Sequence, residues 1–86
     1  MRVAWTKHAL AEFRDLEADN PELAARVVSL IEAIKAAPFT GIGKPEPLKY
    51  DLAGWWSRRI DRQHRLVYRV TSNPSVLTIA QCRQHY

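Results

Sequence analysis

Residues Arg65–Thr71 read Arg-Leu-Val-Tyr-Arg-Val-Thr, a run with the alternation of a half-buried β-strand. Side chains two positions apart share one face of a strand. The two faces would therefore carry two different sets of side chains: Leu66, Tyr68 and Val70 against Arg65, Val67 and Arg69. The first set is the predicted core face, so the two arginines are expected to point away from the layer that covers the sheet.

Three other segments of the second half have strand character, at 48–52, 55–61 and 76–83. Turn residues at 61–64 and at 72–75 separate the last three strands from one another. Strands that are joined by such short turns form an antiparallel meander. The second half is therefore expected to fold as an antiparallel sheet.

The apolar residues of segment 55–61 suggest which of its faces is buried. If Trp56 and Ile60 lie in the core, Arg59 lies on the opposite face. There it would join Arg65, which comes from the next strand. Two arginines from neighbouring strands would then share the open face of the sheet.

The first half is predicted to begin with a short strand at 2–5 and to continue as two helices. Thr6 suits the N-cap of the first helix, and Asn20 and Pro21 suit the cap and first position of the second. Apolar residues recur at helical spacing: Leu10, Phe13 and Leu16 in the first helix, and Leu23, Val27, Leu30, Ile31 and Ile34 in the second. The connection is so short that the helices are expected to form an antiparallel hairpin.

Together these elements predict an α+β fold. A short N-terminal strand and the two-helix antiparallel hairpin would pack on one face of a mostly antiparallel sheet of four to five strands. The 86 residues are expected to form a single domain, 1–86. Apolar residues make up 47% of the chain and charged residues 26%, which is typical of a globular protein and not of a disordered segment.

Neither membrane insertion nor export is expected. No apolar run approaches the roughly 18 residues that a membrane span needs. The N-terminal segment contains Lys7, His8 and Glu12, where a signal peptide would have an apolar stretch. Cys82 is the single cysteine, so no internal disulfide can form. A reduced cytoplasm is the expected compartment.

The excess of positive charge lies in the second half of the chain. Residues 1–43 carry five Lys or Arg and six Asp or Glu, a net charge of −1, whereas residues 44–86 carry eight and three, a net charge of +5. Six of those eight cations are arginines, which favour planar contacts with phosphate or carboxylate. This pattern favours an anionic partner, either nucleic acid or an acidic protein. The alternative is a solvated basic face with no specific partner.

The segment 39–47 joins the helical half to the strands. It contains Gly41, Gly43, Pro45 and Pro47, and each proline fixes its own φ and restricts the residue before it. A loop with a constrained path is expected. Glu46 lies between the two prolines, so neither helix nor ordinary strand pairing is expected there.

Metal sites and common nucleophile sites are not indicated. Cys82 and His85 have a C-x-x-H spacing, but no second pair of ligands accompanies them. The run 41–44 lacks the first glycine and the Ser or Thr of a phosphate-binding loop. Ser57 has no triad signature. Cys82 lies in an apolar strand and is expected to be a small buried hydrophobe.

The histidines and carboxylates allow one further kind of chemistry. His8 and His64 fit surface or structural roles, while the terminal His85 is either part of a frayed end or functional. A carboxylate, several arginines and a histidine can cleave RNA without a metal. The carboxylate takes the 2′-proton, the arginines stabilise the charged transition state, and the histidine protonates the leaving 5′-oxygen.

Several blocks of the sequence resemble the YoeB/Txe toxins, a branch of the RelE/ParE superfamily of bacterial type II toxin–antitoxin systems. The blocks are PFTGIGKPEPLK at 38–49, LAGWWSRRI at 52–60, HRLVY at 64–68 and CRQHY at 82–86, and Trp5 also fits. The resemblance runs over almost the full length. The helices diverge most, for example in the Ala-rich segment 24–37.

The resemblance implies a microbial-RNase-like fold and a ribosome-dependent mRNA endoribonuclease that stops translation. The expected products are a 2′,3′-cyclic phosphate and a 5′-hydroxyl, formed with no metal and no other cofactor. By position, Glu46 matches the general base, His85 the general acid and Arg65 the residue that stabilises the transition state. Tyr86 matches the terminal tyrosine that positions the RNA. Two basic residues match those near the scissile phosphate: Lys49 and Arg59.

The resemblance also implies partners. They are mRNA on the ribosome, rRNA, and an acidic YefM-like antitoxin whose disordered tail folds onto the toxin. Operator DNA would be contacted through the antitoxin, and a homodimer is compatible with the branch. Two alternatives remain: a non-catalytic gyrase poison of the ParE kind, and a passive nucleic-acid-binding module. Both would be indifferent to loss of the proposed acid and base.

Overall fold

The computed structural model describes residues 1–83 of the chain. Its two helices are α1 (Lys7–Asp19) and α2 (Pro21–Ala36), with Asn20 between them. The hydroxyl of Thr6 accepts a hydrogen bond from the backbone N–H of Ala9 at 3.1 Å, and the side-chain oxygen of Asn20 accepts one from the N–H of Leu23 at 3.3 Å. Both predicted N-caps are confirmed, and each satisfies a donor that the first helical turn leaves unpaired.

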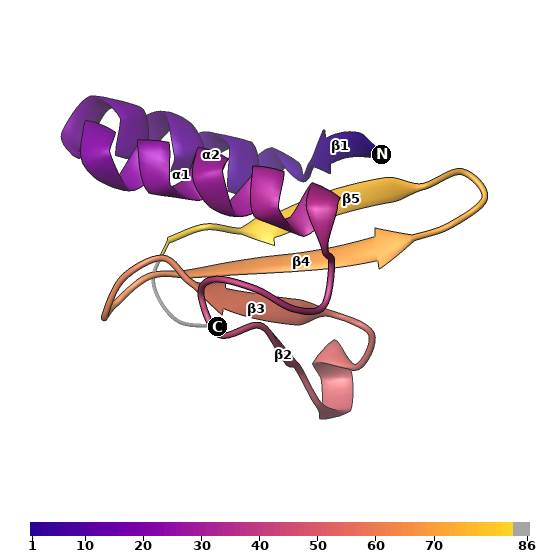
Figure 1. Cartoon of the computed structure of the whole chain (residues 1–86). Helices are drawn as coiled ribbons and strands as arrows, with labels where there is room; N and C mark the ends of the chain where they lie inside the picture. Colours follow the sequence, from indigo (N-terminus) through magenta and orange to yellow (C-terminus); the bar gives the residue numbers. More distant parts are fainter. Residues whose placement is uncertain (84–86) are drawn as a thin grey trace.

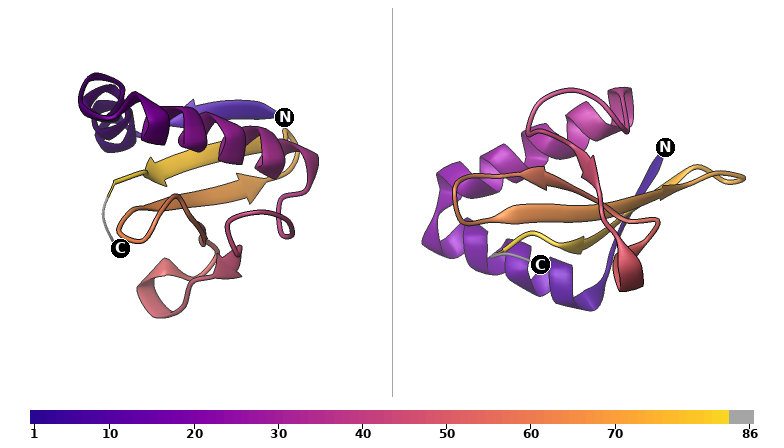
Figure 2. Two further views of the ribbon diagram at one scale, coloured as in Figure 1. Left: turned by 60° about the vertical axis from the view of Figure 1, so that its left-hand side comes forward. Right: turned by 90° about the horizontal axis from the view of Figure 1, so that it is seen from below.

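The strands form one five-stranded sheet in the order β1-β5-β4-β3-β2 (Figure 1). Their bounds are β1 Arg2–Trp5, β2 Glu46–Pro47, β3 Trp56–Arg59, β4 Arg65–Thr71 and β5 Val76–Gln81. β1 pairs with β5 in parallel, and the other neighbours are antiparallel. Both helices follow β1 in the chain, and both lie on one face of the sheet (Figure 2). The predicted α+β class is confirmed.

The core lies between the helices and that face of the sheet. Its fully buried members come from both layers: Ala9, Leu16, Val27, Leu30, Ile34, Leu66, Tyr68, Leu77, Ile79 and Cys82. The face assigned to β4 is therefore correct. The predicted apolar stripe of α1 was wrong at one position: Ala9 is fully buried and belongs to the core, whereas Leu10 is only half-buried. A small side chain at position 9 allows the helix to approach the end of β5 closely.

The expected strand at 48–52 is wrong, and so is the expectation that Glu46 cannot pair. Glu46 lies in β2 opposite Ser57, and Tyr50–Leu52 forms a 3₁₀ turn, η1. Tyr50 has φ +57°, which no strand residue adopts. β2 is an edge strand, where Pro47, which has no N–H, is tolerated at a position that faces away from β3. The next residue, Leu48, donates its backbone N–H to the carbonyl of Trp55 at 2.9 Å.

A buried arginine attaches the loop before β2 to the sheet. Arg58 is 0% exposed, and its guanidinium donates four hydrogen bonds at 2.7–3.2 Å. The acceptors are the carbonyls of Ala37, Thr40 and Ile42 and the hydroxyl of Tyr68. The Tyr68 hydroxyl in turn donates to the carbonyl of Pro38 at 2.8 Å. The path of the loop that leads to Glu46 is thus determined from beneath by β3 and β4.

Neither α-helix in the part of the chain that the structure describes combines the length and apolar character needed to cross a membrane.

Candidate active site

The face of the sheet opposite the helices carries three of the predicted site residues: Glu46, Arg59 and Arg65. Glu46 lies opposite Ser57, and Arg59 lies opposite Arg65. Ser57 and Arg59 are two positions apart on β3, so their side chains share a face. The register therefore brings Glu46, Arg59 and Arg65 together on the open side of the sheet, although 19 positions separate Glu46 from Arg65.

Glu46 and Arg65 form an ion pair. Arg65 Nη1 donates to Glu46 Oε1 at 3.1 Å, and the side chains are 52% and 16% exposed for Glu46 and Arg65 respectively. The carboxylate is thus open to an incoming molecule, whereas the arginine is largely enclosed by its neighbours. An enclosed arginine loses less conformational freedom when it binds a further anion.

Arg59 and Arg65 place two positive charges directly across a strand pair. Like charges in that position repel each other and destabilise the pairing. Glu46 balances one of them, and Arg59 remains exposed. A group of one carboxylate and two guanidinium ions has a net charge of +1, which favours a phosphate between them.

The turn between β3 and β4 keeps these arginines in register. The Asp61 carboxylate oxygen Oδ1 accepts hydrogen bonds from the backbone N–H groups of Gln63 and His64 at 2.8 and 2.7 Å. Burial by itself would raise the pKa of Asp61, but these two hydrogen bonds and the charge of His64 hold that pKa below its ordinary value. The ionised carboxylate therefore closes the turn beside the site.

Lys49 is exposed and precedes η1. It borders a surface pocket of about 480 Å³ that also includes Glu46. The pocket is lined by Glu46, Pro47, Leu48, Lys49, Tyr50 and Leu52. The predicted basic residue Lys49 is therefore placed on the same pocket as the predicted base.

His85 and Tyr86 lie outside the described residues. The segment that leads to them is described, and β5 ends at Gln81, which pairs with Val67 of β4. Val67 pairs with Ser57, and Ser57 pairs with Glu46. The chain thus leaves β5 from the same cross-strand row that contains Glu46.

Two further side chains lie on the open face without a role predicted from the sequence. Ser57 is 0% exposed, and its Oγ has no hydrogen-bond partner among the described residues. Arg69 is exposed, and its guanidinium carbon lies 4.6 Å from the centre of the Trp55 ring. Strand alternation already placed Trp55 and Ser57 on the face of Arg59. Only the register showed that Ser57 is the direct neighbour of Glu46.

Comparison with known proteins now identifies the family. A family model described as the YoeB-like toxin of bacterial type II toxin–antitoxin systems matches residues 5–86. This chain belongs to the YoeB toxin family. It is accordingly a toxin of the type II toxin–antitoxin class, and the resemblance read from the sequence blocks is confirmed.

Similar YoeB toxins match over the whole chain. The YoeB toxin of Streptomyces coelicolor is 45% identical over 100% of both chains. The solved YoeB/ParE toxin from Agrobacterium tumefaciens is 42% identical, covers 100% of both chains and has a TM-score of 0.97. A heterotetrameric YoeB–YefM complex and a YoeB dimer, both from Staphylococcus aureus, have TM-scores of 0.90 and 0.91 at 33% identity, over 100% of this chain and 98% of theirs.

Proposed function

We propose that this YoeB-family toxin is a ribosome-dependent mRNA endoribonuclease that needs no metal. One observation carries the proposal: a half-exposed carboxylate, Glu46, lies 3.1 Å from the enclosed Arg65 and on the same face as Arg59. A base next to two anion-binding groups is what attack of a 2′-hydroxyl on its neighbouring phosphate requires.

The proposed reaction transfers one proton at each end. Glu46 takes the proton of the 2′-hydroxyl, and the 2′-oxygen attacks phosphorus. Arg65 and Arg59 bind the phosphate oxygens as negative charge develops there. The bond from phosphorus to the 5′-oxygen breaks, and His85 donates a proton to that oxygen. The products are a 2′,3′-cyclic phosphate and a 5′-hydroxyl.

The covalent reach of the C-terminus supports a role for His85. Glu46 and Gln81 are separated by three strand spacings, about 14 Å between Cα atoms. His85 follows Gln81 by four positions, which span at most about 14 Å when extended. An imidazole at position 85 can therefore reach the phosphate that Glu46 serves. Tyr86 beside it would position the RNA, and Lys49 would contact the backbone near the scissile phosphate.

The partners that we propose follow from the charge of the molecule and from its relatives. A YefM-like antitoxin would bind this chain, as YefM does in the Staphylococcus aureus complex, and would carry the contacts to operator DNA. The net charge of +5 in residues 44–86 suits both an acidic antitoxin tail and rRNA. A homodimer corresponds to the solved dimer from that organism. Since the substrate is mRNA on ribosomes, the toxin would act in the cytoplasm.

The test is primer extension on mRNA bound to purified ribosomes, with and without EDTA. We expect cleavage by the wild-type chain in both conditions and none above background by Glu46→Gln, which preserves the size of the side chain but removes the base. Cleavage that EDTA abolishes would contradict the metal-independent mechanism. Growth arrest with intact mRNA and inhibited DNA gyrase would favour the ParE-like alternative instead.

A further inference from the structure

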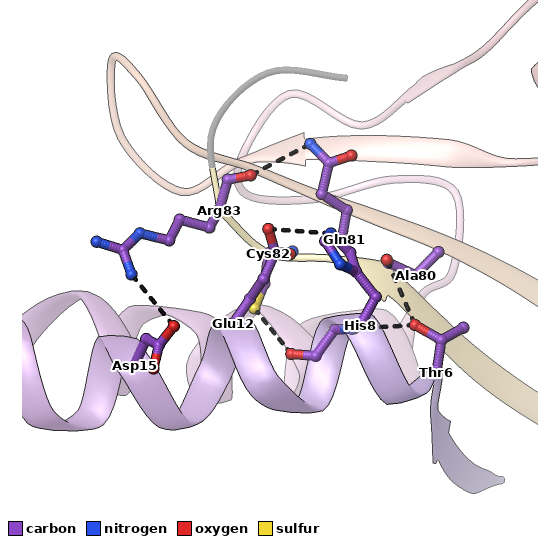
Figure 3. A network of polar contacts seen from close by, with 9 residues as sticks. Thr6, His8, Glu12, Asp15, Ala80, Gln81, Cys82 and Arg83 are labelled. Atoms are coloured by element: carbon purple, nitrogen blue, oxygen red, sulfur yellow. Dashed lines mark hydrogen bonds and ion pairs between the residues drawn. The ribbon is translucent and has the colours of Figure 1, made fainter.

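A carboxylate on α1 bonds the chain where it leaves β5. Glu12 Oε1 accepts a hydrogen bond from the backbone N–H of Cys82 at 2.9 Å, and Glu12 Oε2 lies 3.3 Å from His8 Nε2 (Figure 3). The Glu12 side chain is only 16% exposed. A shielded, ionised acceptor makes a stronger hydrogen bond to a backbone donor than a neutral or exposed acceptor does.

Two aspartates of the same helix hold the next residue. Arg83 Nη1 lies 3.7 Å from Asp15 Oδ2, and Arg83 Nη2 lies 3.5 Å from Asp19 Oδ2. The aspartates are 66% and 62% exposed, so these ion pairs are weaker than the hydrogen bond that the Cys82 N–H donates to Glu12. We call Glu12, Asp15 and Asp19 the α1 clamp.

Covalent geometry links the clamp to the proposed general acid. His85 follows Cys82 by three positions and Arg83 by two, which allows at most about 10 Å and 7 Å between Cα atoms. The clamp therefore sets the origin from which the imidazole reaches the phosphate. If Cys82 were released from α1, the chain segment that leads to His85 would lose this attachment, and we expect the effective concentration of the acid at the leaving oxygen to fall.

We infer that Glu12 is a positioning residue for general-acid catalysis, with Asp15 and Asp19 as weaker supports. Glu12 touches no substrate; it acts by holding the backbone three positions before His85. The inference rests on the proposed ribonuclease function. It assigns different supports to the two ends of the reaction. The sheet holds Glu46 and Arg65, whereas the helical layer holds Cys82, from which the chain continues to the proposed acid.

The experiment compares two leaving groups on ribosome-bound mRNA. One mRNA has the ordinary 5′-oxygen at the cleavage site, and the other has a bridging 5′-sulfur. A thiolate leaves without protonation because the pKa of a thiol is low, about 8.5 for cysteine. A defect in the general acid therefore slows cleavage of the oxygen substrate and spares the sulfur substrate.

The variants are Glu12→Ala, Glu12→Gln and the matched control Glu17→Ala, which removes an exposed carboxylate from the same helix. We expect Glu12→Ala to lower kcat on the oxygen substrate by about 10–100-fold, with KM little changed. On the sulfur substrate its loss should be under about threefold, as for His85→Ala. Glu12→Gln keeps an oxygen acceptor for the Cys82 N–H and should restore most of the rate.

The other possible results each contradict the inference. Equal losses on both substrates, or no loss on either, would overturn the positioning role while wild-type cleavage upholds the proposed function. Absence of wild-type cleavage would overturn both. Should Glu12→Ala fail to fold, the surface double variant D15N/D19N gives the same comparison, with a loss of about threefold or more confined to the oxygen substrate. Equal rates on the oxygen substrate for that variant and the wild type would contradict the clamp.

Discussion

At the scale of single residues, the site combines one open group with one enclosed group. The carboxylate of Glu46 is half-exposed, whereas Arg65 is 16% exposed. Arg65 lies in β4, the central strand of the sheet, with a strand on each side. A phosphate that displaces Glu46 from Arg65 would release the carboxylate as a base at the moment when the arginine takes up the anion.

Removal of either proposed proton-transfer group should abolish most of the cleavage. We expect Glu46→Ala and His85→Ala each to lower the rate of ribosome-bound mRNA cleavage by at least about 100-fold. Folding should change little, because Glu46 is half-exposed and its ion pair is accessible to water. The measurements are single-turnover cleavage and the Tm. Variants that still arrest growth at full strength would show that catalysis is not the mechanism.

Two arginines of β4 provide a matched pair for testing the assignment of the phosphate site. Arg65 pairs with Glu46, whereas Arg69 lies on the same strand and face but stacks over Trp55. We expect Arg65→Ala to lower kcat/KM by at least about tenfold more than Arg69→Ala, because only Arg65 would contact the reacting phosphate. Equal losses would mean that the charge of the whole face matters, and not this position.

Cys82 should be chemically inert while the protein is folded. It is 0% exposed, and burial, with a smaller effect of the Glu12 charge, raises the pKa of its thiol to about 12. The folded state therefore favours the protonated thiol over the thiolate. This preference increases the free energy of unfolding at pH values below 9, and the increase is lost as the pH rises toward 12. At pH 8 the reactive thiolate is therefore a very small fraction of the thiol.

The reactivity of Cys82 in the folded protein can be measured by its reaction with a disulfide reagent. We expect labelling in native buffer at pH 8 to be at least about 100-fold slower than in denaturant. Labelling at the rate of the unfolded chain would show that the end of β5 opens readily.

At the scale of elements, the loop before β2 depends on buried contacts that lie beneath it. Arg58 donates to three loop carbonyls and to Tyr68. Gly43 has φ +83°, and an added Cβ would lie 3.0 Å from the side chain of Leu30 and 3.1 Å from Cβ of Arg58. The carbonyl of Gly43 accepts from the N–H of Arg59 at 2.7 Å. A glycine is therefore required at position 43. The contacts of this loop hold β2 in the position where Glu46 pairs with Arg65.

Replacement of the buried arginine should unfold the element that it supports. Arg58→Met would leave several carbonyls without donors, and we expect a loss of about 3–5 kcal/mol in the free energy of unfolding. The neighbouring variant Arg59→Met, at an exposed position, should change that free energy by less than about 1 kcal/mol. Urea denaturation of both variants provides the comparison. Similar stabilities would mean that the loop is held by other contacts.

At the scale of the whole molecule, the two faces of the sheet have different tasks. The helices bury one face, which supplies the hydrophobic core (Figure 2). The other face stays open and carries arginines from two neighbouring strands. Arg59, Arg65 and Arg69 thus bring positive charge to the side where a nucleic acid would bind, whereas Arg58 is buried and Arg83 pairs with aspartates of α1.

Binding to ribosomes should weaken as salt is added. With the inactive variant Glu46→Gln, we expect the affinity to fall roughly 20-fold between 50 and 200 mM salt if about three phosphates are contacted, because the release of counterions drives such binding. Loss of Arg59 as well should reduce the slope. A salt-independent affinity, measured by co-sedimentation, would contradict an electrostatic interface.

The resemblance to YoeB toxins was recognised from short blocks of residues, and the family comparison confirms it. The roles of Glu46, Arg65, Lys49, Arg59, His85 and Tyr86 remain predictions. The sheet register places Glu46, Arg59 and Arg65 on one side of the sheet, and Lys49 borders the same pocket as Glu46. The strand predicted at 48–52 was wrong, because Tyr50 takes a left-handed conformation that the alternation of side chains does not reveal.

The sequence by itself determined the helices, their caps and the buried face of β4, because these depend on the spacing of residues that are close along the chain. Tertiary structure alone decided the pairing of β2 with β3, the burial of Arg58, and the contact of Glu12 with Cys82 across 70 positions. The physical reason is that register and layer packing are cooperative. They place groups that no local periodicity relates, and the proposed chemistry takes place among such groups.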